Sequence, residues 1–326
     1  MLTIDAPRCP GEQPGTAAPS GACLTIGTFD GLHRAHRFIL EELKVSAVRH
    51  GVKAGIVTFE PSPQIVLHHD FPFILTPLAE KRARLEEAGM DFMYLIRFDD
   101  ALRRTPAEVF LEAMVLQPLR PRLIIVGYDH HFGNERKGDA ALLGSLKLKY
   151  VFDLRVLPEY RHNGGAVKST RVRERLVLGA VRQAGELLGY RYQVSGQIVR
   201  GRGVGAQLGF ATANVAVEPP EKLIPASGVY AAFARFNGDA TRNPPALAVV
   251  NIGFRPTFAG ESQTVEAHIL DFEMRELYGE RLALEFVERL RPEIKFGTVE
   301  ELKAQISGDI ALARMVLAES AESSGR

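Results

Sequence analysis

The chain has few cysteines, almost no net charge and no long apolar run. Its two cysteines, Cys9 and Cys23, cannot form a disulfide framework or a cysteine-rich zinc site. Forty Lys and Arg against thirty-nine Asp and Glu leave a formal charge of +1, so no broad field favours nucleic acid or an anionic membrane. No stretch approaches the roughly 18 consecutive apolar residues of a membrane span, and no secretory signal pattern opens the chain. We therefore expect a cytoplasmic protein that binds small molecules.

Length and composition predict two globular domains. The 326 residues exceed the roughly 100 to 200 residues of a typical domain. Hydrophobic residues make up 46% of the chain and charged residues 24%, which is typical of chains that bury sizeable cores. Residues 1 to 21 are rich in Pro, Gly and Ala without periodicity, so they predict a flexible N-terminal tail. A second flexible tail is expected at residues 319 to 326.

Residues 22 to 188 alternate short β-branched runs with helical patterns. This alternation predicts an α/β domain with a parallel sheet covered by helices, whose binding loops lie at the carboxyl ends of the strands. The expected strands are Ala22–Ile26, Lys53–Thr58, Phe92–Arg97, Leu123–Val126 and Asp153–Val156. The expected helices are His36–His50, Pro77–Ala88, Pro106–Leu116, Lys137–Leu148 and Val172–Leu188.

Residues 189 to 318 have a different texture, with short apolar runs separated by Gly, Pro and Asn. Closely spaced strands without intervening helices predict a small antiparallel barrel or sandwich. The expected strands are Gln193–Val199, Ala213–Val217, Gly228–Phe236, Leu247–Ile252, Thr264–Leu270 and Leu282–Leu290. A helix at Val299–Leu317 should follow and pack on the barrel, because Thr298 and Glu301 form a capping-box pattern at its start.

A histidine pair follows the first expected strand. The segment Leu24–His36 passes from a strand through a Gly-containing loop into a helix, with His33 and His36 three positions apart. Residues at i and i+3 share a helix face, and a helix N-terminus offers amide groups to phosphate. The pair alone is also compatible with a capped turn or part of a metal site. Its GTFDGL loop lacks the G-x-G-x-x-G spacing of a dinucleotide fingerprint.

Two further polar loops belong to the same expected domain. Val126–Gly133 follows a strand and contains Asp129, whereas Lys168–Arg173 precedes a helix. The second loop can cap its helix and bring positive charge toward an anion, although an ordinary N-cap with solvated basic residues explains it as well. Three such loops in one α/β domain together favour an anion site. The candidate residues of the second loop are Ser169, Thr170, Arg171 and Arg173.

The second domain offers a glycine-rich basic loop and a carboxylate in a strand. Glycines within Gly196–Asn214 would let backbone amides close on a phosphate, although a flexible hairpin is the plain alternative. Glu266 alternates with apolar neighbours, so its carboxylate points to one face of its strand. A buried Glu commonly marks a structural ion pair or a working base. The loop glycines are Gly201, Gly203, Gly205 and Gly209.

In order and spacing, residues 22 to about 188 resemble the adenylyltransferase module of bacterial bifunctional riboflavin kinase/FAD synthetases. The resemblance implies a Rossmann-like nucleotidyltransferase domain that transfers AMP from ATP to FMN with Mg²⁺, giving FAD and pyrophosphate. It also implies that His33, His36 and the Ser-Thr-x-x-Arg segment hold the ATP phosphates. The matching segments are Gly27–Gly31 with the two histidines, Val57–Pro61, Val126–Asp129, Phe132–Gly133, Arg136–Gly138 and Ser169–Arg173. Within them, the implied nucleotide-binding residues include Gly27, Thr28, Phe29, Asp30, Gly31 and Asp129.

Residues 190 to 317 resemble the riboflavin kinase module of the same family. The resemblance implies a six-stranded Greek-key barrel with a terminal helix that phosphorylates riboflavin with ATP and Mg²⁺. It places Thr212 and Asn214 at the metal and phosphates and makes Glu266 the catalytic base. Arg291 and Lys295 are expected to secure the barrel and helix or to contact the flavin. The matching segments are Gly196–Asn214, Pro225–Tyr230, Asn251–Thr257, Thr264–Asp271, Leu277–Gly279 and Arg289–Phe296.

The chain departs from both family patterns within the expected sites. In the first module, Ala35 replaces the Gly between the two histidines, and Ser62 replaces a His. The pair His130-His131 and Lys168 also depart from the family pattern. In the second, Ala211 replaces Pro and Ala206 replaces Arg. The lead hypothesis is an enzyme that makes FMN and then FAD. The alternatives are a riboflavin kinase with an impaired first domain and a flavin-binding regulatory protein, and the oligomeric state stays open.

Overall fold

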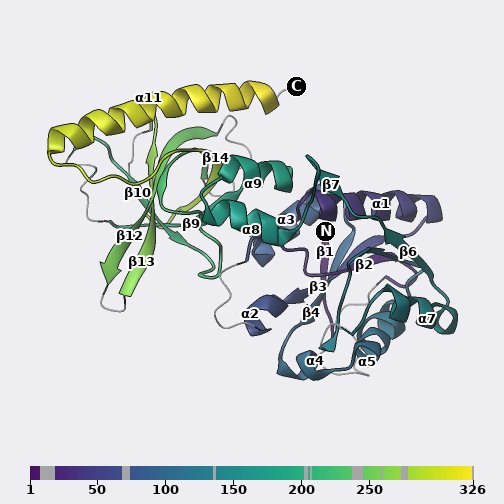
Figure 1. The fold of residues 1–326 in the computed structure, drawn as a ribbon. Coiled ribbons are helices and arrows are strands. Elements are labelled where there is room, and N and C mark those ends of the chain that lie inside the picture. Colours follow the sequence, from purple (N-terminus) through teal and green to yellow (C-terminus); the bar gives the residue numbers. More distant parts are fainter. Residues whose placement is uncertain are drawn as a thin grey trace. The chain divides into compact units, whose positions relative to one another are not determined.

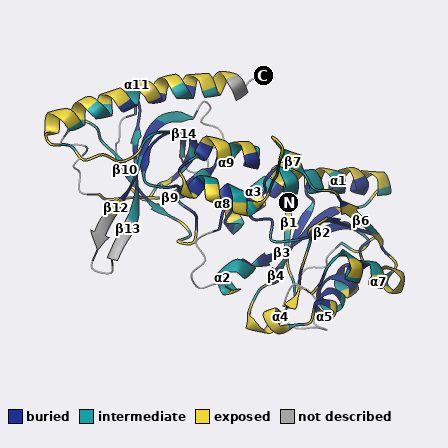
Figure 2. Cartoon of the chain, in the orientation of Figure 1, coloured by how far each residue is buried: buried dark blue, intermediate teal, exposed yellow. Residues whose placement is uncertain are grey.

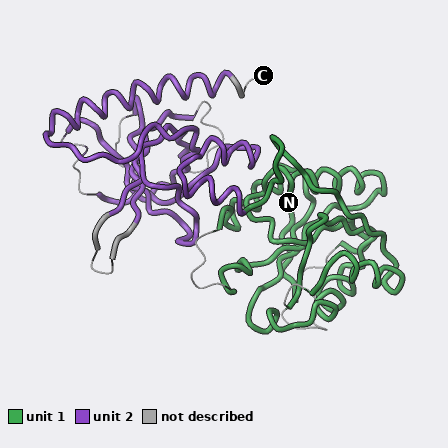
Figure 3. Tube along the Cα trace, viewed as in Figure 1, with its two compact units in different colours: residues 1–169 green, residues 170–326 purple. Residues whose placement is uncertain are grey.

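The computed structural model describes residues 1–7, 19–67, 74–134, 137–201, 205, 208–236, 245–257, 260–272 and 278–324, with side chains except at 255–257, 260–262 and 323–324. The chain forms two compact units, Met1–Ser169 and Thr170–Arg326 (Figure 3). Their elements, labelled in Figure 1, confirm the predicted combination of an α/β domain and a β domain.

Unit 1 contains a six-stranded parallel sheet in the order β1-β4-β3-β2-β5-β6. The inner strands are nearly continuous apolar runs, as a parallel sheet covered on both faces requires. In β3, for example, every residue but the last is buried. The strands are β1 (Leu2–Asp5), β2 (Cys23–Ile26), β3 (Ala54–Glu60), β4 (Phe92–Arg97), β5 (Leu123–Gly127) and β6 (Asp153–Leu157).

Helices cover both faces of this sheet. Neighbouring residues of β3 pack into different hydrophobic clusters. Ile56 packs in a cluster with Leu40 of α1 (Arg34–His50), whereas Val57 packs in one with Phe110 of α5 (Ala107–Leu111). The helices are α1 (Arg34–His50), α2 (Pro63–Leu67), α3 (Leu78–Glu87), α4 (Asp100–Arg104), α5 (Ala107–Leu111), the π-helical turn η1 (Glu112–Leu116), α6 (Gln117–Leu119) and α7 (Ala140–Tyr150). A small ribbon, β7 (Arg161–His162) and β8 (Gly165–Ala166), follows β6.

The predicted N-terminal tail is wrong for its first residues. Leu2–Asp5 form the edge strand β1, which pairs in parallel with β4 so that Leu2 lies opposite Phe92. Ile4 is 1% exposed and belongs to the sheet core. Four residues are too few to display a strand period, which is why composition alone missed this element. Residues 8–18 of the predicted tail lie outside the described part of the chain.

Unit 2 contains a closed antiparallel barrel in the order β10-β13-β12-β11-β14-β9. The closed barrel confirms the prediction and leaves no unpaired sheet edge. The strands are β9 (Gln193–Val199), β10 (Ala213–Val217), β11 (Gly228–Phe236), β12 (Ala246–Thr257), β13 (Gly260–Ile269) and β14 (Arg281–Arg291).

The long helix α11 (Val299–Ser324) packs on the outer face of the barrel. Ala313 and Leu317 are fully buried in a cluster that includes Val249 of β12. Figure 2 shows the opposite side of the helix exposed along most of its length. The predicted tail at residues 319 to 326 is therefore wrong as far as Ser324. Arg191 Nη2 holds the last turns by donating to the Ser320 carbonyl and hydroxyl at 3.0 and 2.9 Å.

The boundary between the units also differs from the prediction. The expected helix Val172–Leu188 is two helices, α8 (Ser169–Val177) and α9 (Val181–Leu188), separated where Gly179 adopts a φ of 74°. Both belong to the second unit rather than the first, because the units divide after Ser169. Arg182 of α9 forms an ion pair with Glu288 of β14, which ties the helix to the barrel.

Candidate active sites

The loop between β2 and α1 brings the two predicted histidines together. His33 is the N-cap residue of α1, and its Nδ1 accepts a hydrogen bond from the backbone N–H of His36 at 3.4 Å. The two imidazole rings stack with centroids 3.7 Å apart and an interplanar angle of 11°. The expected shared face is therefore confirmed, although His33 caps the helix instead of lying within it.

The surroundings of the His36 side chain favour a polar ligand. Burial is the main cause that holds the pKa of His36 well below its usual range, and His33 and Lys81 add to the effect. The imidazole is therefore neutral at pH 7. Its Nδ1 is buried and has no hydrogen-bond partner among the described residues. A buried polar atom without a partner is costly, so this nitrogen marks a place where a ligand atom is favourable.

Asp30 anchors the same loop to the segment that enters α3. Its Oδ1 accepts hydrogen bonds from the backbone N–H groups of Leu75 and Thr76, both at 2.9 Å. The N–H of Gly31 donates to Thr76 Oγ1 at 2.7 Å. Asp30 is only 4% exposed. The sequence predicted nucleotide binding for this residue, and the structure shows that one of its carboxylate oxygens positions the loop.

The remaining predicted residues of the loop pack against the sheet. Gly27 N–H donates to the Val57 carbonyl at 3.0 Å, and the Thr28 carbonyl accepts from Thr58 Oγ1 at 3.4 Å. Phe29 is 3% exposed and lies 5.1 Å, between ring centroids, from His36. These contacts fix the backbone on which the histidines stand.

Lys81 is a buried cation that the sequence pattern does not reveal. It lies in α3, is 3% exposed, and its Nζ lies 3.5 Å from Thr58 Oγ1. Burial lowers the pKa of Lys81, and the carboxylates of Asp30 and Glu60 oppose that shift. A buried lysine behind a candidate phosphate loop is unusual. Its signal in the sequence was weak, because Lys81 sits among other charged residues of an amphipathic helix.

The two other predicted loops of unit 1 join this region only in part. Ser169, the last residue of unit 1, donates from its Oγ to the Asp30 carbonyl at 2.7 Å. Asp129 Oδ2 lies 2.9 Å from Lys168 Nζ in an ion pair. Thr170, Arg171 and Arg173 follow in α8 and belong to the second unit, so their contact with phosphate stays a prediction.

The departures from the family pattern have identifiable surroundings. Ala35 lies within α1, where the helical backbone accepts a methyl group without strain. Ser62 is 7% exposed and its Oγ has no partner among the described residues. Burial lowers the pKa of His130 to about 4. No group of three or more His, Cys, Asp or Glu suited to a metal ion occurs in the described part of the chain.

Strand register builds the candidate site of the barrel. In β13, Glu266 pairs with Asn214 of β10 on one side and with Asn251 of β12 on the other. Directly opposed residues of antiparallel strands point to the same face. Asn251 shares its face with Val249, which packs under α11, so this polar row lies on the outer face of the barrel. Asn251 was not predicted as a site residue, although its place in β12 was.

The glycine-rich loop packs closely against two of the predicted ligands. A Cβ on Gly201 would collide with the Asn214 side-chain amide, and a Cβ on Gly205 would lie 3.2 Å from Thr212 Oγ1. Glycine at these positions therefore lets the loop backbone approach the two side chains. Gly209 adopts a φ of 91°. Gly203 and Ala206 lie outside the described residues.

His268 positions the segment that leads to Thr212. Its Nδ1 lies 2.8 Å from the Ala211 carbonyl, and its ring meets Phe210 edge-on with centroids 5.8 Å apart. His268 follows Glu266 by two residues, so both point to the same face of β13. That spacing was visible in the sequence and could have identified it. Glu266 itself is half-buried, so it is less enclosed than the apolar strand pattern suggested.

Two family models match the two halves of the chain. The FAD synthetase model matches residues 16–171, and the riboflavin kinase model matches residues 188–317. The chain therefore contains one domain of each kind, as the sequence resemblance implied.

No helix among the described residues has the length and apolar character to cross a bilayer.

Relatives that match over nearly their whole length are named for two activities. A bifunctional riboflavin kinase/FMN adenylyltransferase of Escherichia coli K12 is 36% identical over 91% of this chain and 93% of its own length. One of Pseudomonas fluorescens is 34% identical over 92% and 94%. A crystal structure from Streptococcus pneumoniae, described as a macrolide-efflux protein, has a TM-score of 0.84 at 27% identity and covers 96% of this chain and 99% of its own.

These matches extend over both units and agree with the parallel sheet and the closed barrel. They support riboflavin phosphorylation to FMN in the C-terminal domain and adenylylation of FMN to FAD in the N-terminal domain, with ATP as the donor. The chain belongs to the bifunctional riboflavin kinase/FMN adenylyltransferase family.

Proposed function

We propose that Glu266 is the catalytic base of riboflavin phosphorylation. The 5′-hydroxyl must lose a proton as its oxygen attacks the γ-phosphorus of ATP and ADP leaves, and a positioned carboxylate can accept that proton. The observation that carries the proposal is the register that holds Glu266 between Asn214 and Asn251 on an outer face of the barrel. Half-burial leaves its carboxylate accessible to a substrate.

The metal of the kinase site is Mg²⁺ in this proposal, held by Thr212 and Asn214 together with the ATP phosphates. Mg²⁺ prefers oxygen ligands and commonly takes only one or two from the protein. The hydroxyl and amide oxygens of these residues fit that preference, and the close approach of Gly201 and Gly205 brings backbone amides beside them. When bound, the ion neutralises charge on the transferring phosphoryl group.

In adenylyl transfer, His33, His36 and Ser169 hold the ATP phosphates. A phosphate role for Thr170, Arg171 and Arg173, which lie in the second unit, stays a prediction from the sequence. The FMN phosphate oxygen that attacks the α-phosphorus is already ionised, so no strong base is needed. Orientation and stabilisation of the leaving pyrophosphate matter instead. The stacked histidines at the N-terminus of α1 support this role, because His36 presents a buried nitrogen without a protein partner.

The substrates follow from these two reactions: ATP, riboflavin and FMN are consumed, and FMN and FAD are formed. We place the reactions in the cytoplasm, where these small molecules and free thiols such as Cys23 coexist. The efflux role named for the Streptococcus pneumoniae structure has no support from the two family models, which both describe flavin enzymes.

One product analysis tests this function. Riboflavin, ATP and MgCl₂ are incubated with the protein, and flavins are separated by HPLC over time. We expect FMN to rise first and FAD to follow. FMN without FAD, also when FMN is supplied, would identify a riboflavin kinase with an impaired first domain. No product would favour a flavin-binding regulatory protein. Replacing MgCl₂ with EDTA should abolish both products.

A further inference from the structure

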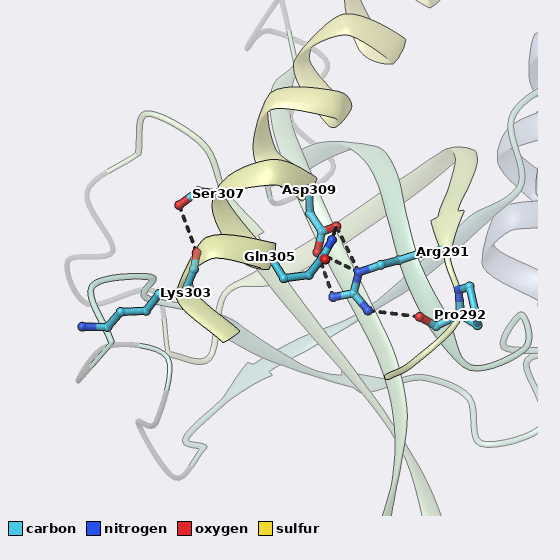
Figure 4. Close-up of polar contacts among 6 residues, drawn as sticks. All are labelled: Arg291, Pro292, Lys303, Gln305, Ser307 and Asp309. Carbon is cyan, nitrogen blue, oxygen red and sulfur yellow. Dashed lines mark hydrogen bonds and ion pairs between the residues drawn. The ribbon is translucent and has the colours of Figure 1, made fainter. Parts of the chain in front are cut away.

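A short segment between β14 and α11, Pro292–Gly297, has no regular structure, and we call it the strap. Its first end is fixed by Arg291. The guanidinium donates to both carboxylate oxygens of Asp309 in α11, at 2.8 to 3.1 Å, and to the Pro292 carbonyl at 3.0 Å (Figure 4). Gln305 Nε2 adds a hydrogen bond to Asp309 at 2.9 Å. Asp309 is 4% exposed, so this anchor is well shielded from water.

The second end of the strap is fixed by the first turn of α11. Glu301 Oε2 accepts from the backbone N–H groups of Gly297 and Thr298 at 2.9 and 3.3 Å. The N–H of Glu301 donates to Thr298 Oγ1 at 3.2 Å, which completes a capping box. The same helix therefore holds both ends of the strap.

The strap carries Glu293 onto the backbone of β12. A Cβ added to Gly253 would lie 2.5 Å from Glu293 Oε1 and 3.5 Å from Asn251 Nδ2. The carboxylate therefore occupies the space that any larger residue at position 253 would fill. No hydrogen bond or ion pair joins Glu293 to another residue in the described part of the chain. Glu293 is exposed, so a ligand on this face of the barrel can reach its carboxylate.

The position of Gly253 places this carboxylate beside the kinase site. Gly253 is two residues from Asn251 in β12, so both lie on the same face of the strand. Asn251 is paired with Glu266, and a diagonal neighbour across an antiparallel pair lies roughly 7 Å away. Glu293 and Glu266 therefore approach one region of the outer face from two different elements.

We propose that Glu293 is a specificity-determining residue of the kinase site, whose carboxylate accepts hydrogen bonds from the secondary hydroxyl groups of the ribityl chain. The primary hydroxyl at the end of that chain then lies near Glu266. A carboxylate offers several acceptor positions, which suits a chain of adjacent hydroxyl groups. The proposal rests on the proposed role of Glu266, because it orients the substrate toward that residue.

Steady-state kinetics of FMN formation provide the first test. Glu293→Ala should raise the KM for riboflavin on the order of 10-fold, with kcat and the KM for ATP within about 2-fold of wild type. Glu293→Gln keeps one acceptor oxygen, so its KM for riboflavin should lie between the values for wild type and Glu293→Ala. Glu300→Ala, which removes an exposed carboxylate from the nearby first turn of α11, is the matched control and should change nothing. An unchanged KM for riboflavin in Glu293→Ala would overturn the proposal.

A substrate without secondary hydroxyls gives the sharper test. A flavin with a plain 5-hydroxypentyl chain retains the reacting hydroxyl, so wild type and Glu293→Ala should phosphorylate it equally well. Equal 10-fold losses with this flavin and with riboflavin would overturn the proposal. If instead Glu266→Gln retains full kcat, the base assignment fails, and that outcome is distinct from any result with Glu293.

The close approach at Gly253 supplies a steric test. Gly253→Ala should raise the KM for riboflavin as Glu293→Ala does, because the new methyl group displaces the carboxylate. In the Glu293→Ala background, the same substitution should add less than about 2-fold. Equal effects in both backgrounds would show that Gly253 acts independently of Glu293. FAD formation from supplied FMN, which takes place in the other domain, checks that each variant is folded.

Discussion

The two candidate sites of this chain are assembled by different means. In the barrel, Asn214, Glu266 and Asn251 are neighbours because three strands are hydrogen-bonded in register. In the parallel-sheet domain, His33 and His36 stand on a loop and a helix end that Asp30 anchors through side-chain to backbone hydrogen bonds. The strand register of the first site should therefore survive substitution of its side chains, whereas the geometry of the second should depend on its anchors.

The largest effect is expected at the base of the kinase site. Glu266→Gln removes proton acceptance but keeps the shape of the side chain and the register of β13. FMN formation should fall on the order of 100-fold, the usual contribution of a general base. FAD formation from supplied FMN should stay within about 2-fold. Initial rates from HPLC measure both, and a fully active kinase would remove Glu266 from the mechanism.

A smaller loss is expected at the histidine pair. His36→Ala removes a ring that stacks on His33 and a nitrogen available to phosphate. FAD formation from supplied FMN should fall by roughly 10-fold or more, as expected for a lost hydrogen bond to a charged group. Ala35→Gly is the neighbouring control and should keep FAD formation within about 2-fold, since a helical backbone already accepts Ala. A gain of activity in Ala35→Gly would show instead that the methyl group crowds the phosphates.

The anchor of the loop should affect stability as well as activity. Asp30→Ala leaves two buried backbone N–H groups, those of Leu75 and Thr76, without their acceptor. Unfolding of the N-terminal domain by urea should become easier by about 2 kcal/mol. Asp30→Asn keeps an acceptor oxygen and should lose less than half as much. FMN formation should be spared in both variants, and equal stabilities for Asp30→Ala and wild type would contradict the anchoring role.

The smallest effect concerns pH. Burial lowers the pKa of His130 to about 4, below the value of about 6.5 expected in the unfolded chain. The unfolded state therefore binds this proton first, and stability is lost as pH falls from about 6.5 toward 4. Between pH 7 and 5.5 the contribution is about 1 kcal/mol. His130→Phe should flatten the pH dependence of the urea midpoint by that amount, and an identical slope in both proteins would contradict it.

Sequence patterns predicted individual strands and helices better than they predicted which residues of different elements lie next to each other. The strands that carry Glu266 and Asn214 were evident, but only the register shows that they pair and that Asn251 completes the row. Lys81 was hidden because a helix pattern does not reveal which charged residue is buried. β1 was hidden because its stability comes from pairing with β4, some 90 residues later, which no local window contains.

For the same reason, the sequence predicted only some of the contacts of the strap. The capping box at Thr298 and Glu301 was predicted from spacing and is confirmed by its hydrogen bonds. The close approach of Glu293 to Gly253 involves residues 40 positions apart, and the sequence of neither segment predicts it. The close approach of a side chain to a glycine depends on the tertiary structure. Such contacts are where the structure adds most to the family resemblance.

One chain holds two independent sites, so variants that each lack one site should complement each other. Glu266→Gln and His36→Ala are each incubated alone, and then mixed, with riboflavin, ATP and MgCl₂, and FAD is measured by HPLC. We expect little FAD from either variant alone and rapid FAD formation from the mixture, because the intact kinase of one supplies FMN to the intact adenylyltransferase of the other. A mixture that makes no more FAD than the separate variants would contradict it.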